Sequence, residues 1–156
     1  MMQSKQPELP ERLTKFKNDI PGCAMRQADQ KFTANTWKDK LRGDSDLDYI
    51  IEKFPCGLDR SDLTSIAEEA AKNRDVEHYR KLFLASMIWR FGGDREAGFG
   101  AWRTQQMMDS EHFDGTLKNT SDLVLEGRIR DAYDLFKIKW CGPAFFTKYF
   151  YLGTGS

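Results

Sequence analysis

The chain has few of the side chains that usually hold a structural metal. Its 156 residues include only three cysteines and two histidines. Cys23, Cys56 and Cys141 are far apart with no C-x-x-C pair, and His78 and His112 are also well separated. This spacing argues against the usual zinc and iron–sulfur sites. We therefore expect no metal and no cofactor.

The chain also lacks a long apolar run and an excess of one charge. No apolar stretch approaches the length that spans a bilayer, and the first residues, MMQSKQPELPERL, contain no apolar signal core. We expect a cytoplasmic protein with reduced cysteines and no membrane contact. The 24 basic and 24 acidic side chains cancel. This balance argues against a broad electrostatic surface for nucleic acid, but it leaves room for a local basic face.

Strand patterns are scarce, whereas helical patterns recur along the chain. Apolar residues make up 40% and charged residues 31% of the sequence, as in a globular protein. We expect a single all-α domain over residues 1–156, a compact bundle of about six helices. Residues 1–40 are expected to be partly irregular, with one helix over Leu13–Ile20.

Three helices of the first half are indicated by an N-cap side chain followed by apolar residues at helical spacing. Their predicted caps are Asp44 or Ser45, then Asp59 or Ser61, and then Asp75. Pro55 should end the first helix, because the residue before a proline avoids helical geometry. Gly92 and Gly93 should end the third helix.

The second half indicates three further helices. A weaker one is expected over Asp94–Met108, where Gly98 and Gly100 lower helix stability. Ser121 is expected to open a helix with an apolar side that ends near Phe136. Pro143 suits the first turn of a last helix, which we expect to run to Leu152.

Only residues 137–142 separate these last two helices, so they should form a tight hairpin. Gly142 can adopt a positive φ at the sharp turn, and amides at a helix start can hold a phosphate. Lys137 and Lys139 would add positive charge beside the turn. The local sequence also fits a simpler interpretation, in which Gly142 and Pro143 only begin a helix.

The segment Ile138–Leu152, IKWCGPAFFTKYFYL, resembles a known motif. It is similar to the helix–hairpin–helix of bacterial proteins related to 8-oxoguanine DNA glycosylase, within the helix–hairpin–helix DNA glycosylase superfamily. In that branch Gly-Pro-Ala-Phe-Phe-Thr-Lys recurs, followed by aromatic and aliphatic residues. Residues 82–93 and 98–103 are compatible with the same family. The resemblance covers about the second half of the chain and implies a helix–hairpin–helix over residues 121–152.

The resemblance implies a lysine nucleophile at Lys148. In the family such a lysine attacks the sugar C1′ of a flipped nucleotide, which expels an oxidised or modified purine and leaves a Schiff base. An amine must be neutral to attack, and apolar surroundings favour the neutral form. Phe145, Tyr151 and Leu152 are the helical neighbours of Lys148 in the expected last helix.

The resemblance also implies double-stranded DNA as the partner. The positions expected to bind the DNA backbone are Lys137, Lys139, Gly142 and Ala144. The extruded base needs a pocket with stacking walls, for which the candidates are Trp89, Trp102 and Phe145. Some bacterial relatives belong to anti-phage defence operons, which would extend the role from base excision repair to defence.

The chain departs from the family pattern at three positions. Trp140 stands where the commoner eukaryotic motif has its first glycine, and Ala144 stands where that motif has its lysine. The assisting aspartate normally follows the lysine by roughly twenty residues, whereas the sequence ends at Ser156. We therefore expect a C-terminally truncated glycosylase or a relative without catalysis. Two other classes stay open, a catalytically silent nucleic-acid-binding module and a helical protein-interaction domain.

Overall fold

The computed structural model describes residues 34–55, 57–91, 97–143, 146, 147 and 149. Every regular element in these ranges is a helix, which confirms the all-α class. The seven helices of the described part are α2 (Ala34–Lys40), α3 (Ser45–Lys53), α4 (Arg60–Asn73), α5 (Val76–Phe91), α6 (Ala97–Met108), α7 (Phe113–Leu125) and α8 (Ile129–Leu135). Among them, none is long and apolar enough to cross a membrane.

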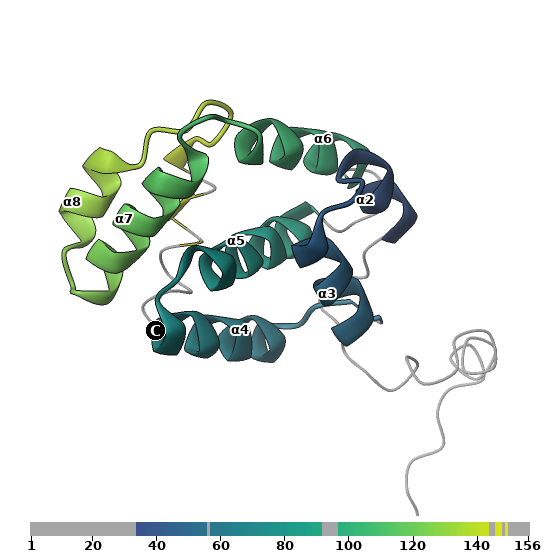
Figure 1. The fold of residues 1–156 in the computed structure, drawn as a ribbon, viewed down its shortest axis with the longest axis horizontal. Coiled ribbons are helices and arrows are strands. Elements are labelled where there is room, and N and C mark those ends of the chain that lie inside the picture. The colour runs from purple at the N-terminus through teal and green to yellow at the C-terminus, as the bar shows by residue number, and fades with distance from the viewer. Residues whose placement is uncertain (1–33, 56, 92–96, 144–145, 148, 150–156) are drawn as a thin grey trace, which may run out of the picture.

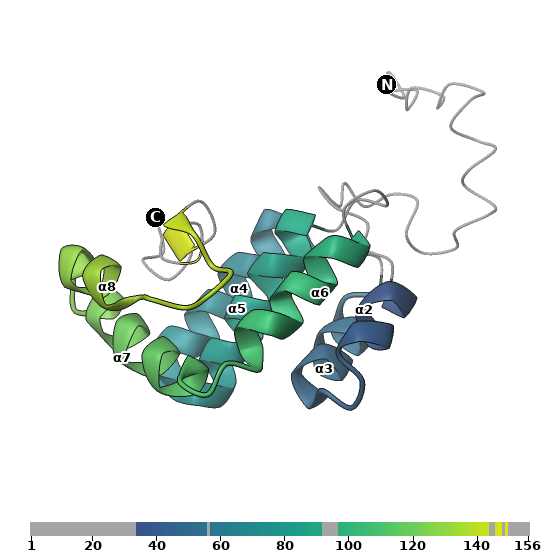
Figure 2. The same cartoon turned by 90° about the horizontal axis from the view of Figure 1, so that it is seen from above.

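Helix α5 forms the centre of the bundle. It packs against α3, α4, α6 and α7, and Figures 1 and 2 show α7 and α8 on one side of it and α2 and α3 on the other. Residues 82–88 are buried without interruption, as expected for a helix covered all round. Phe83 contacts the rings of Phe113 and Tyr149 edge-on, with ring centroids 5.0 and 5.7 Å apart. The core therefore joins α5 to α7 and to the last described residue.

Aspartates cap the helices of the first half, as the sequence predicts. The Asp44 side chain accepts two backbone N–H groups at 3.0 Å at the start of α3. Asp59 and Asp62 form a reciprocal capping box at the start of α4. Asp75 accepts the N–H of His78 at 2.8 Å in the first turn of α5. These bonds satisfy N–H groups that a helix start leaves without partners.

The helix expected to begin at Ser121 is wrong in its bounds. Ser121 lies inside α7, where its side chain is buried, and α8 begins separately at Ile129. Gly127 separates the two helices, because it adopts a left-handed φ of 79°. Glycine reaches this conformation without steric cost. Residues 121–136 therefore form parts of two antiparallel helices rather than one.

Helix α2 was not expected from the sequence, which favoured an irregular chain up to residue 40. The helix is anchored by Trp37, which is 0% exposed, and α2 packs against α6. This anchoring depends on a partner distant in the sequence, so it has no local pattern. The predicted helix Leu13–Ile20 and the predicted stop at Gly92 and Gly93 lie outside the described residues.

Gly100 allows α6 to lie directly on α5. A Cβ atom at Gly100 would lie 2.3 Å from the Cβ of Phe91, which is closer than two carbon atoms can approach. At Gly98, by contrast, the nearest atom would be 4.0 Å away, in the side chain of Thr36. Glycine lowers the stability of helix α6, and the close contact with α5 offsets this loss. The contact also fixes α6 beside the candidate site.

Candidate functional site

The chain after α8 makes a tight turn. The N–H of Cys141 donates to the carbonyl of Ile138 at 3.0 Å and closes a four-residue turn. The described residues that follow are helical from Pro143 onward, and the N–H of Phe146 donates to the Gly142 carbonyl at 3.3 Å. A turn therefore separates α8 from the helical residues that follow, and the helix–hairpin–helix expected over residues 121–152 stays a prediction.

The left-handed residue of this turn is Trp140, not Gly142. Trp140 has a φ of 75°, while Gly142 is absent from the glycines with positive φ. The expectation that Gly142 adopts a positive φ is therefore wrong. Trp140 is the third residue of the Ile138–Cys141 turn, where type II turns require a positive φ and favour glycine. Trp140 stands where the commoner eukaryotic motif has its first glycine, and its backbone has a conformation suited to glycine.

Helix α6 holds Trp140 in this conformation. The Nε of Arg103 donates to the Trp140 carbonyl at 2.6 Å. The Trp140 ring packs edge-on against Trp102, with ring centroids 5.2 Å apart. A left-handed conformation costs a residue with a side chain about 1–2 kcal/mol. The hydrogen bond and the ring contact offset this cost, so the turn depends on α6.

The outer side of the turn is open and positively charged. A Cβ atom at Gly142 would have no atom within 4 Å, so packing does not require a glycine there. Lys137 and Lys139 are both exposed, and the Lys139 Nζ lies 5.5 Å from the centroid of the Trp140 ring. Ala144, the fourth residue expected to bind the DNA backbone, lies outside the described residues.

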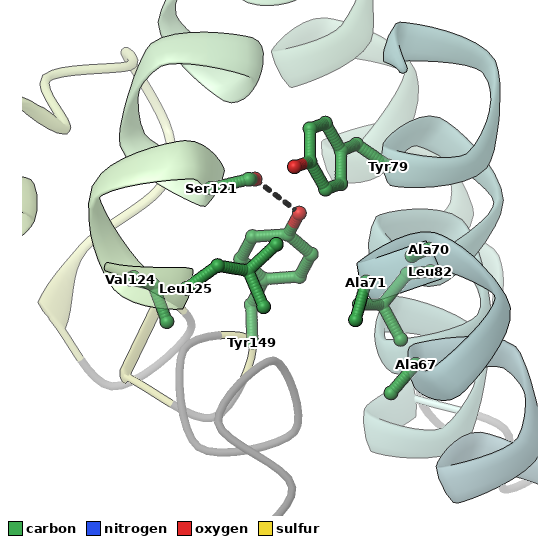
Figure 3. Close-up of a pocket in the computed structure, with 9 residues that line it drawn as sticks. All are labelled: Ala67, Ala70, Ala71, Tyr79, Leu82, Ser121, Val124, Leu125 and Tyr149. Atoms are coloured by element: carbon green, nitrogen blue, oxygen red, sulfur yellow. Dashed lines mark hydrogen bonds between the residues drawn. The ribbon is translucent and has the colours of Figure 1, made fainter. Parts of the chain in front are cut away.

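The inner side of the hairpin is anchored in the core. Tyr149 is buried, and its hydroxyl is hydrogen-bonded to Ser121 of α7 at 2.5 Å, as Figure 3 shows. Phe146 packs against Tyr133 and Phe136, with ring centroids 5.0 and 5.1 Å apart. Ser121, taken from the sequence as the start of a helix, instead ties the hairpin to α7.

A small pocket lies beside this anchor (Figure 3). Its volume is about 10 Å³, which holds no more than one water molecule. The lining residues come from α4, α5, α7 and the end of the hairpin: Ala67, Ala70, Ala71, Tyr79, Leu82, Ser121, Val124, Leu125 and Tyr149. This pocket cannot hold a purine base, and it contains none of the three residues expected in the base pocket.

A carboxylate at the edge of the pocket is fully engaged in bonds. Asp122 accepts the Tyr79 hydroxyl at 2.6 Å and bonds to the Lys118 ammonium group, while Arg74 lies 3.5 Å away. Although burial opposes it, bonding to Lys118 and Tyr79 lowers the pKa of Asp122 below its ordinary value. Asp122 is therefore held as an anion and connects α5 to α7.

The residues expected in the base pocket are not joined by a described contact. Trp102 packs against Phe99 and Trp140, at centroid distances of 6.1 and 5.2 Å. Trp89 is half-buried on α5 and packs against the hydrophobic core. Phe145 lies outside the described residues, as does the expected nucleophile Lys148. The expectation of a shared pocket therefore stays a prediction.

Two further residues of the site are placed by the structure. Cys141, at the turn, is buried, and burial raises the pKa of its thiol to about 12. It therefore acts as a packing residue rather than a reactive thiolate. Phe99 was missed, although its spacing from Trp102 places both rings on one face of α6. The opposite face of that helix contains the buried Gly100, Ala101 and Thr104.

Comparison with family models identifies the family of the chain. Residues 24–156 match the model of the family described as "Putative 8-oxoguanine DNA glycosylase OGG-like protein". The chain belongs to this family. No match was found among the curated proteins or among the solved structures. The matched part of this OGG-like protein includes all described helices, the hairpin and the sequence position of Lys148.

Proposed function

We propose that this OGG-like protein is a DNA glycosylase with lyase activity, acting on an oxidised or otherwise modified purine in double-stranded DNA. Membership of the family supports the general activity. The observation that carries the proposal is the turn from Ile138 to Cys141, whose third residue has the left-handed backbone of a glycine. In the sequence, Lys148 follows this turn.

The hairpin would bind the DNA backbone. Phosphate contacts position a protein on a duplex without reading its sequence. Lys137 and Lys139 are exposed and form no ion pair with a carboxylate of the described residues. The space beside Gly142 would let a phosphate approach the main chain closely. Ala144, with no bulky side chain, would extend this contact.

Lys148 would supply the chemistry. Its neutral Nζ would attack C1′ of the flipped nucleotide, and the base would leave with the electrons of the N-glycosidic bond and take up a proton. Loss of the Nζ proton and opening of the sugar ring would give the Schiff base. Removal of a C2′ proton would then break the C3′–O bond, and water would release the lysine. Trp89, Trp102 and Phe145 remain the proposed walls for the extruded base.

Borohydride trapping tests this proposal. Reduction of the Schiff base by borohydride should give a stable covalent adduct between the protein and duplex DNA containing 8-oxoguanine, seen as a slower band in a denaturing gel. The Lys148→Gln variant should give no adduct. Lys72→Gln is the matched control, because Lys72 is exposed on α4, and it should trap as well as the wild-type protein.

The same assay separates the alternatives. An adduct that persists in Lys148→Gln would show that another amine is the nucleophile. If no modified purine gives an adduct but duplex binding persists and weakens with salt, the protein is a catalytically silent nucleic-acid-binding module. If neither is seen, a helical protein-interaction domain remains. We also propose a cytoplasmic location and a role in DNA repair or anti-phage defence, which fractionation and phage-plating assays would test.

A further inference from the structure

We propose that Phe99, Trp102 and Trp140, here called the aromatic row, form a stacking surface for unpaired nucleobases. The row would bind single-stranded DNA beside the hairpin. It rests on the proposed function only in that the ligand is DNA, because stacking on the row requires neither a lesion nor Lys148.

The row is continuous and open to solvent. Trp102 lies between the other two rings, at centroid distances of 6.1 Å from Phe99 and 5.2 Å from Trp140. Phe99 is 57% exposed and Trp140 is 42% exposed. Neighbouring exposed rings of this kind mark an interaction site more often than isolated surface residues do. A ligand with flat apolar faces would fit the row.

The charge around the row points to a polyanion. The segments that carry it, residues 97–108 and 136–143, contain Arg103, Lys137 and Lys139 but no carboxylate. The whole chain, by contrast, has equal numbers of basic and acidic side chains. Aromatic rings interleaved with cations are typical of sites that bind single-stranded nucleic acid, where bases stack and phosphates meet the cations.

Unpaired bases fit the row better than paired ones. In a duplex, each base is covered on both faces by its neighbours, so an aromatic ring reaches a face only where a base is unstacked. The rings of the row come from α6 and the turn, which the Arg103–Trp140 hydrogen bond of 2.6 Å joins. The row is thus formed before a ligand arrives, which lowers the entropy cost of binding.

The backbone at Trp140 supports a functional role for its ring. A glycine would adopt the φ of 75° at this position without steric cost. A large aromatic side chain is present there instead, and it is exposed. Strained residues of this kind occur mainly at functional sites. The strain at Trp140 is accounted for if its ring contacts a ligand.

Fluorescence anisotropy with a labelled, unmodified oligo-dT tests the proposal. Phe99→Ala and Trp140→Gly should each weaken binding about tenfold, the effect of losing one stacked base. Trp140→Gly removes the ring while relieving the backbone, so circular dichroism should show an intact fold. Trp140→Phe keeps a ring and should recover most of the affinity.

Tyr49→Ala is the matched control, because Tyr49 also combines an exposed ring with nearby cations. Its ring is 36% exposed, with the Lys53 and Lys81 ammonium groups 5.3 and 4.8 Å from its centroid. This variant should bind oligo-dT like the wild-type protein. Unchanged affinity in both row variants, or an equal loss in Tyr49→Ala, would overturn the proposal. A change of oligomeric state in Trp140→Gly without loss of oligo-dT affinity would overturn it in favour of a protein interface.

The result is independent of catalysis. Oligo-dT contains no lesion, so its binding is measured without any catalytic step, and Lys72→Gln on α4 should bind it as well as the wild-type protein. Failed borohydride trapping together with ring-dependent oligo-dT binding would reject the proposed glycosylase and keep the aromatic row. Successful trapping with oligo-dT binding that is insensitive to the rings would do the reverse.

Discussion

The α3–α5 region and the hairpin region, which is α8 with the turn after it, are stabilised by different kinds of interaction. Helices α3 and α4 start with aspartate side chains bound to backbone N–H groups. Helix α8, which leads into the hairpin, starts at Ile129, and the Arg128 side chain before it makes no capping hydrogen bond. The turn that follows contains the left-handed Trp140. The first region largely follows local sequence preferences, with the left-handed Arg74 at the end of α4 as an exception. The second region is held by contacts with α6 and α7. Departures from local preference are expected where function constrains the chain.

The two regions also treat their charges differently. Arg80 of α5 lies within ion-pair distance of Asp44, Asp46 and Asp114, and so links α3, α5 and the start of α7. Burial and the neighbouring Asp44 raise the pKa of Asp46, an effect that Arg80 opposes. Lys137 and Lys139 have no such partner among the described carboxylates. Charges are thus neutralised in the scaffold and left available at the hairpin.

Substitution at Gly100, where α6 meets α5, should have the largest effect on the free energy of unfolding. Gly100→Ala would force its Cβ against Phe91, at 2.3 Å in the present packing. Overpacking of this kind costs about 1–3 kcal/mol, so the urea midpoint should fall. Gly115→Ala in α7, where no atom lies within 4 Å of the added Cβ, should instead gain up to about 1 kcal/mol. Equal midpoints for the two variants would contradict the close contact.

Removal of a helix cap should have the next largest effect. Asp59→Ala would remove the side-chain half of the capping box at the start of α4, including the 2.7 Å bond from the Asp62 N–H. A lost cap costs about 1 kcal/mol, measurable by chemical denaturation. Thr64→Ala on the same helix is the control, because the Thr64 hydroxyl bonds only to a carbonyl one turn back. A stability as high in Asp59→Ala as in the control would show that the cap contributes little.

The smallest expected effect distinguishes two substitutions at Trp140. Both Trp140→Gly and Trp140→Ala remove the contact with Trp102, but only glycine relieves the left-handed backbone. Trp140→Gly should therefore be more stable than Trp140→Ala by about 1 kcal/mol, as measured by thermal and urea unfolding. The usual order, with alanine more stable than glycine, would show that the turn does not keep this conformation in solution.

The parts of the fold that were predictable from sequence depend on local interactions. The caps at Asp44 and Asp59 need only the next three residues, so their pattern is visible in the sequence. Helix α2 depends on burial of Trp37 against distant elements, and the break at Gly127 interrupts an apolar stripe that continues across it. The sequence around Trp37 shows no clear helical pattern, so α2 was missed. The helical pattern continues on both sides of Gly127, so the break there was missed.

The turn after α8 was predictable from the sequence, but its geometry was not. The family match over residues 24–156 agrees with the resemblance seen around Gly142 and Lys148, and the roles of the site residues stay predictions. The identity of the left-handed residue was missed, because glycine is favoured at positive φ and the tertiary contact from Arg103 that holds Trp140 is invisible in the sequence. The aromatic row was missed for the same reason, since it joins rings from two segments.

One peptide unit of the turn has both of its polar ends occupied. The carbonyl of Trp140 accepts from Arg103, and the N–H of the same unit, on Cys141, donates to Ile138. This peptide plane cannot rotate to meet an incoming phosphate without breaking both bonds, and Pro143 has no N–H to offer. If the hairpin binds DNA as proposed, the Gly142 amide is therefore the one backbone donor within residues 141–143 that could receive a phosphate, which would limit where the sugar–phosphate chain can cross the molecule.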